Sequence, residues 1–316
     1  MIIHVPNKDI IVPKDPLSIQ SEIAGFYKIE KLSVDAFGNA IEASREVLAD
    51  WFPNIITDQG LNRIGTATWN LACQVGSGTA TPLVTDTGLQ TFIAGTTTVQ
   101  SSVVSAQGSP PYYGAQTRTY RFAAGVAAGN LSEVGIGWLS TGSNLFSRAR
   151  ILDGSSNPTT ITVLVTEVLD VTYEPRNYVP SVDVTGNFTV TGVGNIGFTA
   201  RGASATDSLW APVGVHTYTN AIVYAGSIGA VTGIPSGASS AGATVTSPSY
   251  VNNSLERVFN YAFSLSQGNV TGGISSFLAI PGNNSWGQFQ FGFGTVISKT
   301  SAQTLTLSFR HSWARR

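Results

Sequence analysis

The feature that most constrains this chain is a two-residue alternation of large apolar side chains in its C-terminal half. Apolar residues recur at every second position in three runs, at residues 259–265, 289–293 and 305–313. Successive side chains of a β-strand point to opposite faces, so this period predicts strands with one buried face. Glycine- and asparagine-rich turns separate the runs, as in a β-sandwich. Strands are predicted at residues 182–191, 195–200, 220–225, 257–265, 274–280, 288–297 and 304–313.

The N-terminal half shows the same period more weakly. Residues 25–47 predict a hairpin that turns at 35–39, and residues 132–138 and 145–152 predict antiparallel neighbours. Further strands are predicted at 69–75 and 117–122. Residues 160–180 are compatible with one long strand or with two strands joined by a bulge.

These patterns predict an all-β fold of two antiparallel, β-sandwich-like domains. A chain of 316 residues exceeds the usual size of one core. We therefore expect a β-rich N-terminal domain over 25–180 and a β-sandwich C-terminal domain over 181–316, preceded by an extended arm over 1–24. Two short helices are expected, at 58–64, where Thr57 or Asp58 provides a cap, and at 86–93, where Asp86 or Thr87 does.

The arm alternates proline with large aliphatic residues. Pro6, Pro13 and Pro16 exclude a helix, so short extended pieces are expected. The arm is either a first edge strand on its own domain or a segment that docks on another subunit. Its candidate assembly residues are Ile2, Ile3, Val5, Ile10, Ile11, Val12 and Leu17.

Charged residues make up only 11% of the chain, against roughly 25% in an average soluble domain, and the net charge is −1. No block of Lys and Arg provides a field that would attract nucleic acid, so nucleic-acid binding is disfavoured. We find no apolar run near 18 residues and no signal-peptide pattern at the N-terminus. Synthesis in the cytoplasm without membrane insertion is therefore expected.

No residue pattern predicts a catalytic, metal or cofactor site. His4, His216 and His311 lack metal-ligand spacing, and Cys73 fits a small strand residue better than a nucleophile. His311 shares the apolar face of its predicted strand, which favours a core or interface histidine. The glycine-rich run at 226–233 lacks the helix that a phosphate-binding turn requires. We expect a protein that is not an enzyme and needs no cofactor.

Four aromatic residues lie in Gly-, Pro- and Ser-rich loops, where their rings either stack on sugars or pack in the loop base. They are Tyr112, Tyr113, Trp210 and Tyr250.

Four stretches carry a family resemblance. They are WFPNIITDQGLNRIGT at 51–66, LSEVGIGWLSTGSNLFSRARI at 131–151, LDVTYEPRNYVP at 169–180 and TLTLSFRHSWARR at 304–316. Together they resemble virion structural proteins of tailed bacteriophages, of the tail-fibre or minor tail protein type.

The resemblance implies a structural component of the virion tail, in a fibre, at the tail tip or associated with the baseplate. It implies assembly with other virion tail proteins, self-association as a trimer and a contribution to host attachment. The alternative is a module that binds a host receptor or glycan. A glycan-degrading enzyme is less favoured, because only Asp183, Asp207 and Glu256 supply acids in the C-terminal half. A head or collar decoration protein is also a less favoured alternative.

Overall fold

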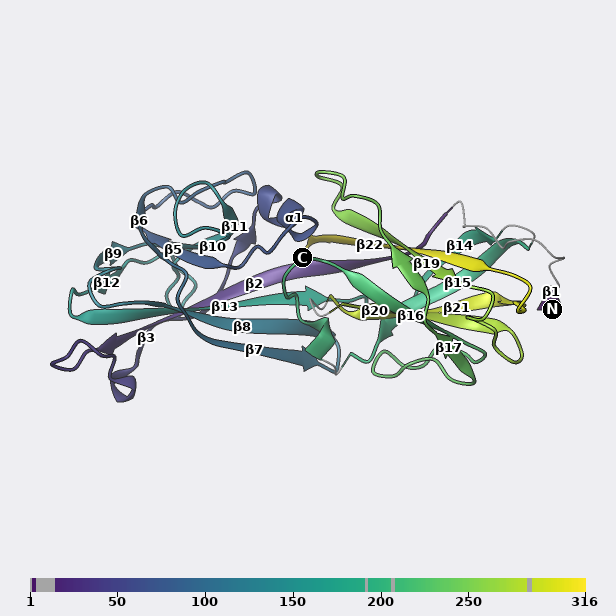
Figure 1. The fold of residues 1–316 in the computed structure, drawn as a ribbon. Helices are drawn as coiled ribbons and strands as arrows, with labels where there is room; N and C mark the ends of the chain where they lie inside the picture. The colour runs from purple at the N-terminus through teal and green to yellow at the C-terminus, as the bar shows by residue number, and fades with distance from the viewer. Residues whose placement is uncertain (1, 4–14, 191–192, 206–207, 283–285) are drawn as a thin grey trace.

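The computed structural model describes residues 2–3, 15–190, 193–205, 208–282 and 286–316. Its regular structure is almost entirely β-strand, in several largely antiparallel sheets. Figure 1 shows an elongated molecule with two lobes end to end. The predicted all-β, sandwich-like fold is confirmed.

One long strand, β2 (Leu17–Ser33), belongs to both lobes. Its 17 residues span roughly 55 Å at a rise of about 3.3 Å per residue. Leu17 and Ile19, near its start, are buried in the core of the C-terminal lobe. Ile23 and Tyr27, further along, are buried in the core of the N-terminal lobe. Ser18, Gln20 and Glu22 alternate with these residues on the more exposed face, so one strand contributes to two cores.

The eight-stranded sheet that contains β2 runs the length of the molecule, and we call it the large sheet. Its order is β18-β19-β22-β2-β13-β8-β7, and β3 pairs with β2 beyond the end of β22. β22 runs parallel to β2 and β13 runs antiparallel to it. The other strands of the large sheet are β3 (Glu46–Pro53), β7 (Val99–Gln107), β8 (Tyr113–Phe122), β13 (Glu167–Tyr178), β18 (Thr244–Thr246), β19 (Glu256–Phe263) and β22 (Leu305–Arg315).

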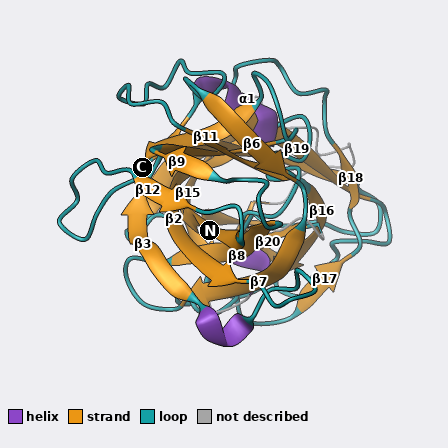
Figure 2. Ribbon diagram, turned by 90° about the vertical axis from the view of Figure 1, so that its left-hand side faces the viewer, coloured by secondary structure: helices purple, strands orange, loops and turns teal. Residues whose placement is uncertain are grey.

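In the N-terminal lobe a five-stranded sheet covers one face of the large sheet. Figure 2 shows β6, β9 and β11 across from β2, β3, β7 and β8. Trp69 and Phe146 stack between the sheets with ring centroids 3.9 Å apart. The small sheet has the order β4-β11-β10-β5-β6, and β9 and β12 form a separate pair. The bounds are β4 (Ile55–Ile56), β5 (Ala72–Gly76), β6 (Phe92–Thr96), β9 (Gly129–Leu131), β10 (Glu133–Gly137), β11 (Leu145–Arg150) and β12 (Ile161–Val163).

The helix predicted at 58–64 is present as α1 (Asp58–Ile64), next to the junction of the lobes. Thr57 caps it, because its hydroxyl accepts a hydrogen bond from the Gly60 N–H at 3.0 Å. Leu61 and Ile64 are buried against the sheets. A 3₁₀ turn, η1 (Glu42–Ser44), precedes β3.

In the C-terminal lobe a seven-stranded sheet packs on β19, β22 and the start of β2. Its order is β14-β15-β21-β20-β16-β17, with β1 beside β21. Phe289, Phe291 and Phe309 meet in the core between the two sheets. The bounds are β1 (Ile2–Ile3), β14 (Val184–Val190), β15 (Gly194–Ala203), β16 (Tyr218–Tyr224), β17 (Ser239–Ala241), β20 (Ile274–Pro281) and β21 (Gln288–Ile297), with a 3₁₀ turn η2 (Ser208–Trp210).

The helix predicted at 86–93 is absent, and that prediction is wrong. Asp86 Oδ2 accepts from the Leu83 N–H at 2.8 Å and closes a turn instead of capping a helix. The buried carboxylate of Glu133 then accepts from the N–H groups of Gln90 and Thr91, which holds this segment against the small sheet. β6 begins at Phe92. A distant carboxylate therefore overrides the local capping pattern.

The predicted boundary at residues 24 and 25 does not separate two units, because β2 passes through it. Residues 17–24 are part of the large sheet rather than of an arm. The predicted boundary at 180 lies where the chain leaves β13 and enters β14 of the other sheet. Residues 160–180 form two strands, since β12 pairs with β9 while β13 lies between β2 and β8.

Candidate functional site

Three of the seven predicted assembly residues lie within the described part of the chain. Ile2 and Ile3 form β1, which pairs in parallel with Val296 and Ile297 of the same chain. Leu17 is fully buried in the chain's own core, so its assignment to an assembly surface is wrong. The remaining four lie outside the described residues: Val5, Ile10, Ile11 and Val12.

Two of the four predicted ligand-contact aromatics are held in packing. Trp210 is fully buried, and its indole N–H donates to the Ala203 carbonyl at 2.9 Å, so a sugar cannot reach it. Tyr250 stacks on Trp313 at 6.0 Å between centroids, and its hydroxyl donates to Asn62 Oδ1 at 2.9 Å. For these two, packing in the loop base is the role that the structure assigns.

The other two aromatics lie at the start of β8, Tyr113 as its first residue and Tyr112 just before it, and both have protein neighbours. Tyr112 packs against the core of the C-terminal lobe. The Arg176 guanidinium lies 4.7 Å from the ring centroid of Tyr113 and 4.4 Å from that of Phe26. This cation–π arrangement occupies the ring that would otherwise be offered to a ligand. Each of the four aromatics therefore packs against other parts of the chain.

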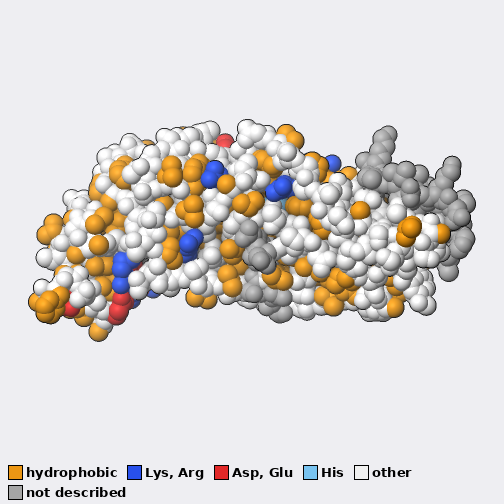
Figure 3. Space-filling model, in the orientation of Figure 1, with side chains coloured by type: hydrophobic (Ala, Val, Ile, Leu, Met, Phe, Trp, Pro, Cys, Tyr) orange, Lys and Arg blue, Asp and Glu red, His pale blue; other side chains and the backbone are white. Residues whose placement is uncertain are grey.

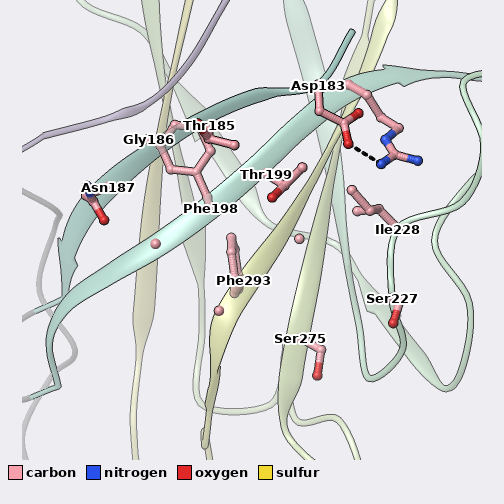
Figure 4. A pocket seen from close by; sticks show the side chains of 14 residues that line it. Asp183, Thr185, Gly186, Asn187, Phe198, Thr199, Ser227, Ile228, Ser275 and Phe293 are labelled. Carbon is pink, nitrogen blue, oxygen red and sulfur yellow. Dashed lines mark hydrogen bonds and ion pairs between the residues drawn. The ribbon is translucent and has the colours of Figure 1, made fainter.

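A surface hollow lies on the outer face of the seven-stranded sheet, and we call it the outer-sheet groove (Figure 4). Its volume is about 940 Å³. Glycines at outward positions leave the floor without side chains, and Thr185, Asn187 and Thr199 provide hydroxyl and amide groups beside them. The floor glycines are Gly197, Gly292 and Gly294.

A loop between β16 and β17 forms one wall of the outer-sheet groove, where Ser227 and Ile228 face the sheet. Gln290 holds this loop: its Oε1 accepts from the Gly229 N–H at 2.8 Å, and its Nε2 donates to the Ala230 carbonyl at 2.9 Å. Gln290 is fully buried. Because the loop is anchored to a central strand, the wall is preformed.

The groove contains one ion pair. Asp183 Oδ2 lies 2.5 Å from Arg201 Nη2, and Arg201 Nη1 donates to the Gly229 carbonyl at 3.1 Å. Asp183 is the one carboxylate among the described residues that line the groove. Hydrolysis of a glycosidic bond with paired carboxylates needs two, about 5 to 10 Å apart. The described lining of the groove therefore does not provide such a pair.

Sequence reasoning did not single out this groove, although a signal for it was present. In β21, Phe289, Phe291 and Phe293 alternate with Gln290, Gly292 and Gly294. The phenylalanines mark the buried face, so the alternate glycines leave the outer face hollow. No sequence pattern predicted the position of the loop between β16 and β17, because that position depends on hydrogen bonds to Gln290 in a distant strand.

Two histidines that are distant in sequence meet in the interior between the lobes. His216 Nε2 lies 2.5 Å from His311 Nδ1, and His311 Nε2 lies 3.0 Å from Ser21 Oγ. Both imidazoles are fully buried, and His216 also packs against Trp286 and Trp313. Burial lowers the pKa of His311 to about 3 and that of His216 well below its usual value. The expectation that His311 is a core residue is confirmed.

The buried acids have structural partners. Glu133 is fully buried, accepts from the backbone N–H groups of Gly78, Gln90 and Thr91, and pairs with Arg148 at 2.7 Å. Asp170 on the outer face of the large sheet binds Arg121 through both oxygens, at 2.8 and 2.7 Å. Such fully bonded carboxylates fix loops and strands.

Among the described residues, no group of three or more His, Cys, Asp and Glu side chains is arranged to hold a metal ion. Cys73 lies in β5 and is fully buried, which raises its thiol pKa well above the usual value. No helix within the described ranges is long and apolar enough to span a membrane.

Comparison with protein families, with curated proteins and with solved structures finds no match for this chain.

Proposed function

We propose that this protein is a structural, non-enzymatic component of a bacteriophage tail that assembles with other tail proteins. The four stretches that resemble tail-fibre and minor tail proteins suggest the particle. The observation that best supports a structural role is β2, which builds the cores of both lobes and joins them into one elongated body. A rod of this kind is suited to spanning distance between virion parts.

The use of polar side chains in the interior favours the same role. Glu133 holds a loop to the small sheet, Gln290 holds a loop to the seven-stranded sheet, and His216 and His311 lie between the lobes. Each stabilises one arrangement of the backbone. Figure 3 shows a face with few charged side chains, as expected for a protein that packs against partners.

The location that follows from this proposal is the tail of the virion, after synthesis in the host cytoplasm. The resemblance to tail fibres implies a trimer, whereas β7, which has no second neighbouring strand among the described residues, favours twofold pairing. Heads and tails separated from disrupted particles provide a test, since mass spectrometry should find the protein in the tail fraction. Its recovery in the head fraction alone would favour a head or collar protein.

A second candidate function is binding of a host-surface glycan in the outer-sheet groove. The observation that favours it is the combination of Asn187, Thr185 and Thr199 with a glycine floor and the apolar Ile228 wall. Sugars are recognised by such hydrogen-bonding groups beside a small apolar surface.

Asn187→Ala should lower binding of the isolated protein to host cells at least tenfold. Thr189→Ala is the matched control, because Thr189 is exposed on the same strand but does not line the groove. Equal binding by both variants would exclude the groove as the site. Release of oligosaccharides from host envelope would instead identify an enzyme.

A further inference from the structure

β7 (Val99–Gln107) forms one border of the large sheet. It pairs with β8 along one side, and among the described residues no strand lies along its other side. The main-chain N–H and C=O groups on that side are therefore available to a further strand.

The other edges of the two long sheets are short or carry protective residues. β17 and β18 have three residues each, and β3 carries Glu46, Asp50 and Pro53. β14 has seven residues, and Gly186 within it lowers the strand propensity of that segment. β7 has nine residues without a charged side chain or a proline, and it is the longest edge strand in the described part of the chain. Charge, proline and shortness are the features by which edges avoid pairing, and β7 lacks all three.

Two valines in the middle of β7 are exposed on opposite faces of the sheet. Val103, opposite Thr117, is 62% exposed on the outer face, and Val104, opposite Gln116, is 41% exposed on the inner face. An added strand would cover part of both side chains. Burying apolar surface in this way contributes about 25 cal/mol per Å².

We propose that β7 pairs antiparallel with β7 of a second copy of this chain, around a twofold axis at Val103. The outward row Ser101, Val103, Ser105 is the same in both directions about that residue. Val103 then faces its own mate and Ser101 faces Ser105 of the second copy, while on the inner face Ser102 faces Val104. Because β7 is uncharged, the pairing brings no like charges together, and the two large sheets become one continuous sheet.

Cysteine cross-linking tests this register, because the natural Cys73 is buried and does not compete. Opposed residues of antiparallel strands have Cα atoms about 4.5 to 5.5 Å apart, which a disulfide can bridge. Val103→Cys should form a covalent dimer on oxidation. Ser102→Cys alone should form at least tenfold less covalent dimer. The double variant Ser102→Cys, Val104→Cys should form the covalent dimer again, because these two positions face each other across the pair. Equal linking of Val103→Cys and Ser102→Cys would overturn the proposal.

Light scattering gives the second readout. The unmodified chain should have twice its monomer mass of 33.1 kDa. Val103→Lys should raise the dissociation constant of the dimer at least tenfold without changing the circular dichroism spectrum, because the side chain is exposed. Val165→Lys is the control, since Val165 is 72% exposed outside β7. A monomer, a trimer or a dimer that tolerates Val103→Lys would overturn the pairing. That result would leave the proposed tail location standing, because the pairing is argued from the sheet edge alone.

Discussion

At the scale of single residues, the buried imidazoles of His216 and His311 predict an acid-sensitive fold. An unfolded imidazole binds a proton below about pH 6.5, whereas burial holds the folded pKa of His311 at about 3 and lowers that of His216 as well. The unfolded state therefore binds more protons as the pH falls from 6.5 towards 3, and stability is lost across that window. At pH 5 His311 should cost about 2 kcal/mol relative to pH 8, and His216 should add a loss of the same sign.

Denaturant unfolding at several pH values measures this loss. His311→Gln removes one titrating group, so the free energy of unfolding of that variant should fall less steeply between pH 8 and pH 5. His4→Gln is a control that leaves the buried pair intact. If the His311→Gln slope equals that of the unmodified chain, the buried pair does not titrate as described.

Glu133 is predicted to be the most sensitive buried acid. Glu133→Gln keeps the shape but removes the charge opposite Arg148 and places an N–H₂ group among backbone donors. Arg148 would keep Asp86 as a partner at 2.6 Å but would lose the fully buried one, which should lower the free energy of unfolding by about 3 kcal/mol. Glu174→Gln, on the partly exposed outer face, should cost under about 1 kcal/mol by the same assay. Similar losses for the two variants would contradict the role of Glu133.

At the scale of elements, β22 supports more than the sheet in which it lies. It separates β19 from β2, and Leu305, Leu307 and Phe309 fill the C-terminal core. Trp313 reaches the N-terminal core, where its indole N–H donates to the Leu61 carbonyl at 2.9 Å. Truncation before Leu305 should leave insoluble protein, whereas removal of Arg316 alone should not. Soluble, folded protein after the longer truncation would show that β22 is peripheral.

Most strands of the fold were predictable, because a two-residue period depends only on which side chains are buried. β19, β21 and β22 follow from Phe259, Phe291 and Phe309 with their neighbours at two-residue spacing. The segment around Asp86 was not predictable, since Glu133 fixes it from a distant strand. Part of the candidate site was predictable from alternate glycines in β21, but the ion pair of Asp183 with Arg201 depends on how β14 and β15 meet.

At the scale of the whole molecule, two cores share β2 and β22, so the lobes should unfold together. Calorimetry should give a single transition for the unmodified chain. Trp313→Ala should lower its midpoint without splitting it, at a cost of about 3 to 5 kcal/mol. Two separate transitions would show that the shared strands do not couple the lobes.

The central claim is that this elongated, two-lobed chain is built into the tail of a bacteriophage. Electron microscopy of intact particles labelled with a gold-tagged antibody against the purified protein tests it most directly. The account predicts label on the tail, at a fibre, at the tip or at the baseplate. Label confined to the head or collar would contradict it. So would the absence of the protein from both intact and disrupted particles.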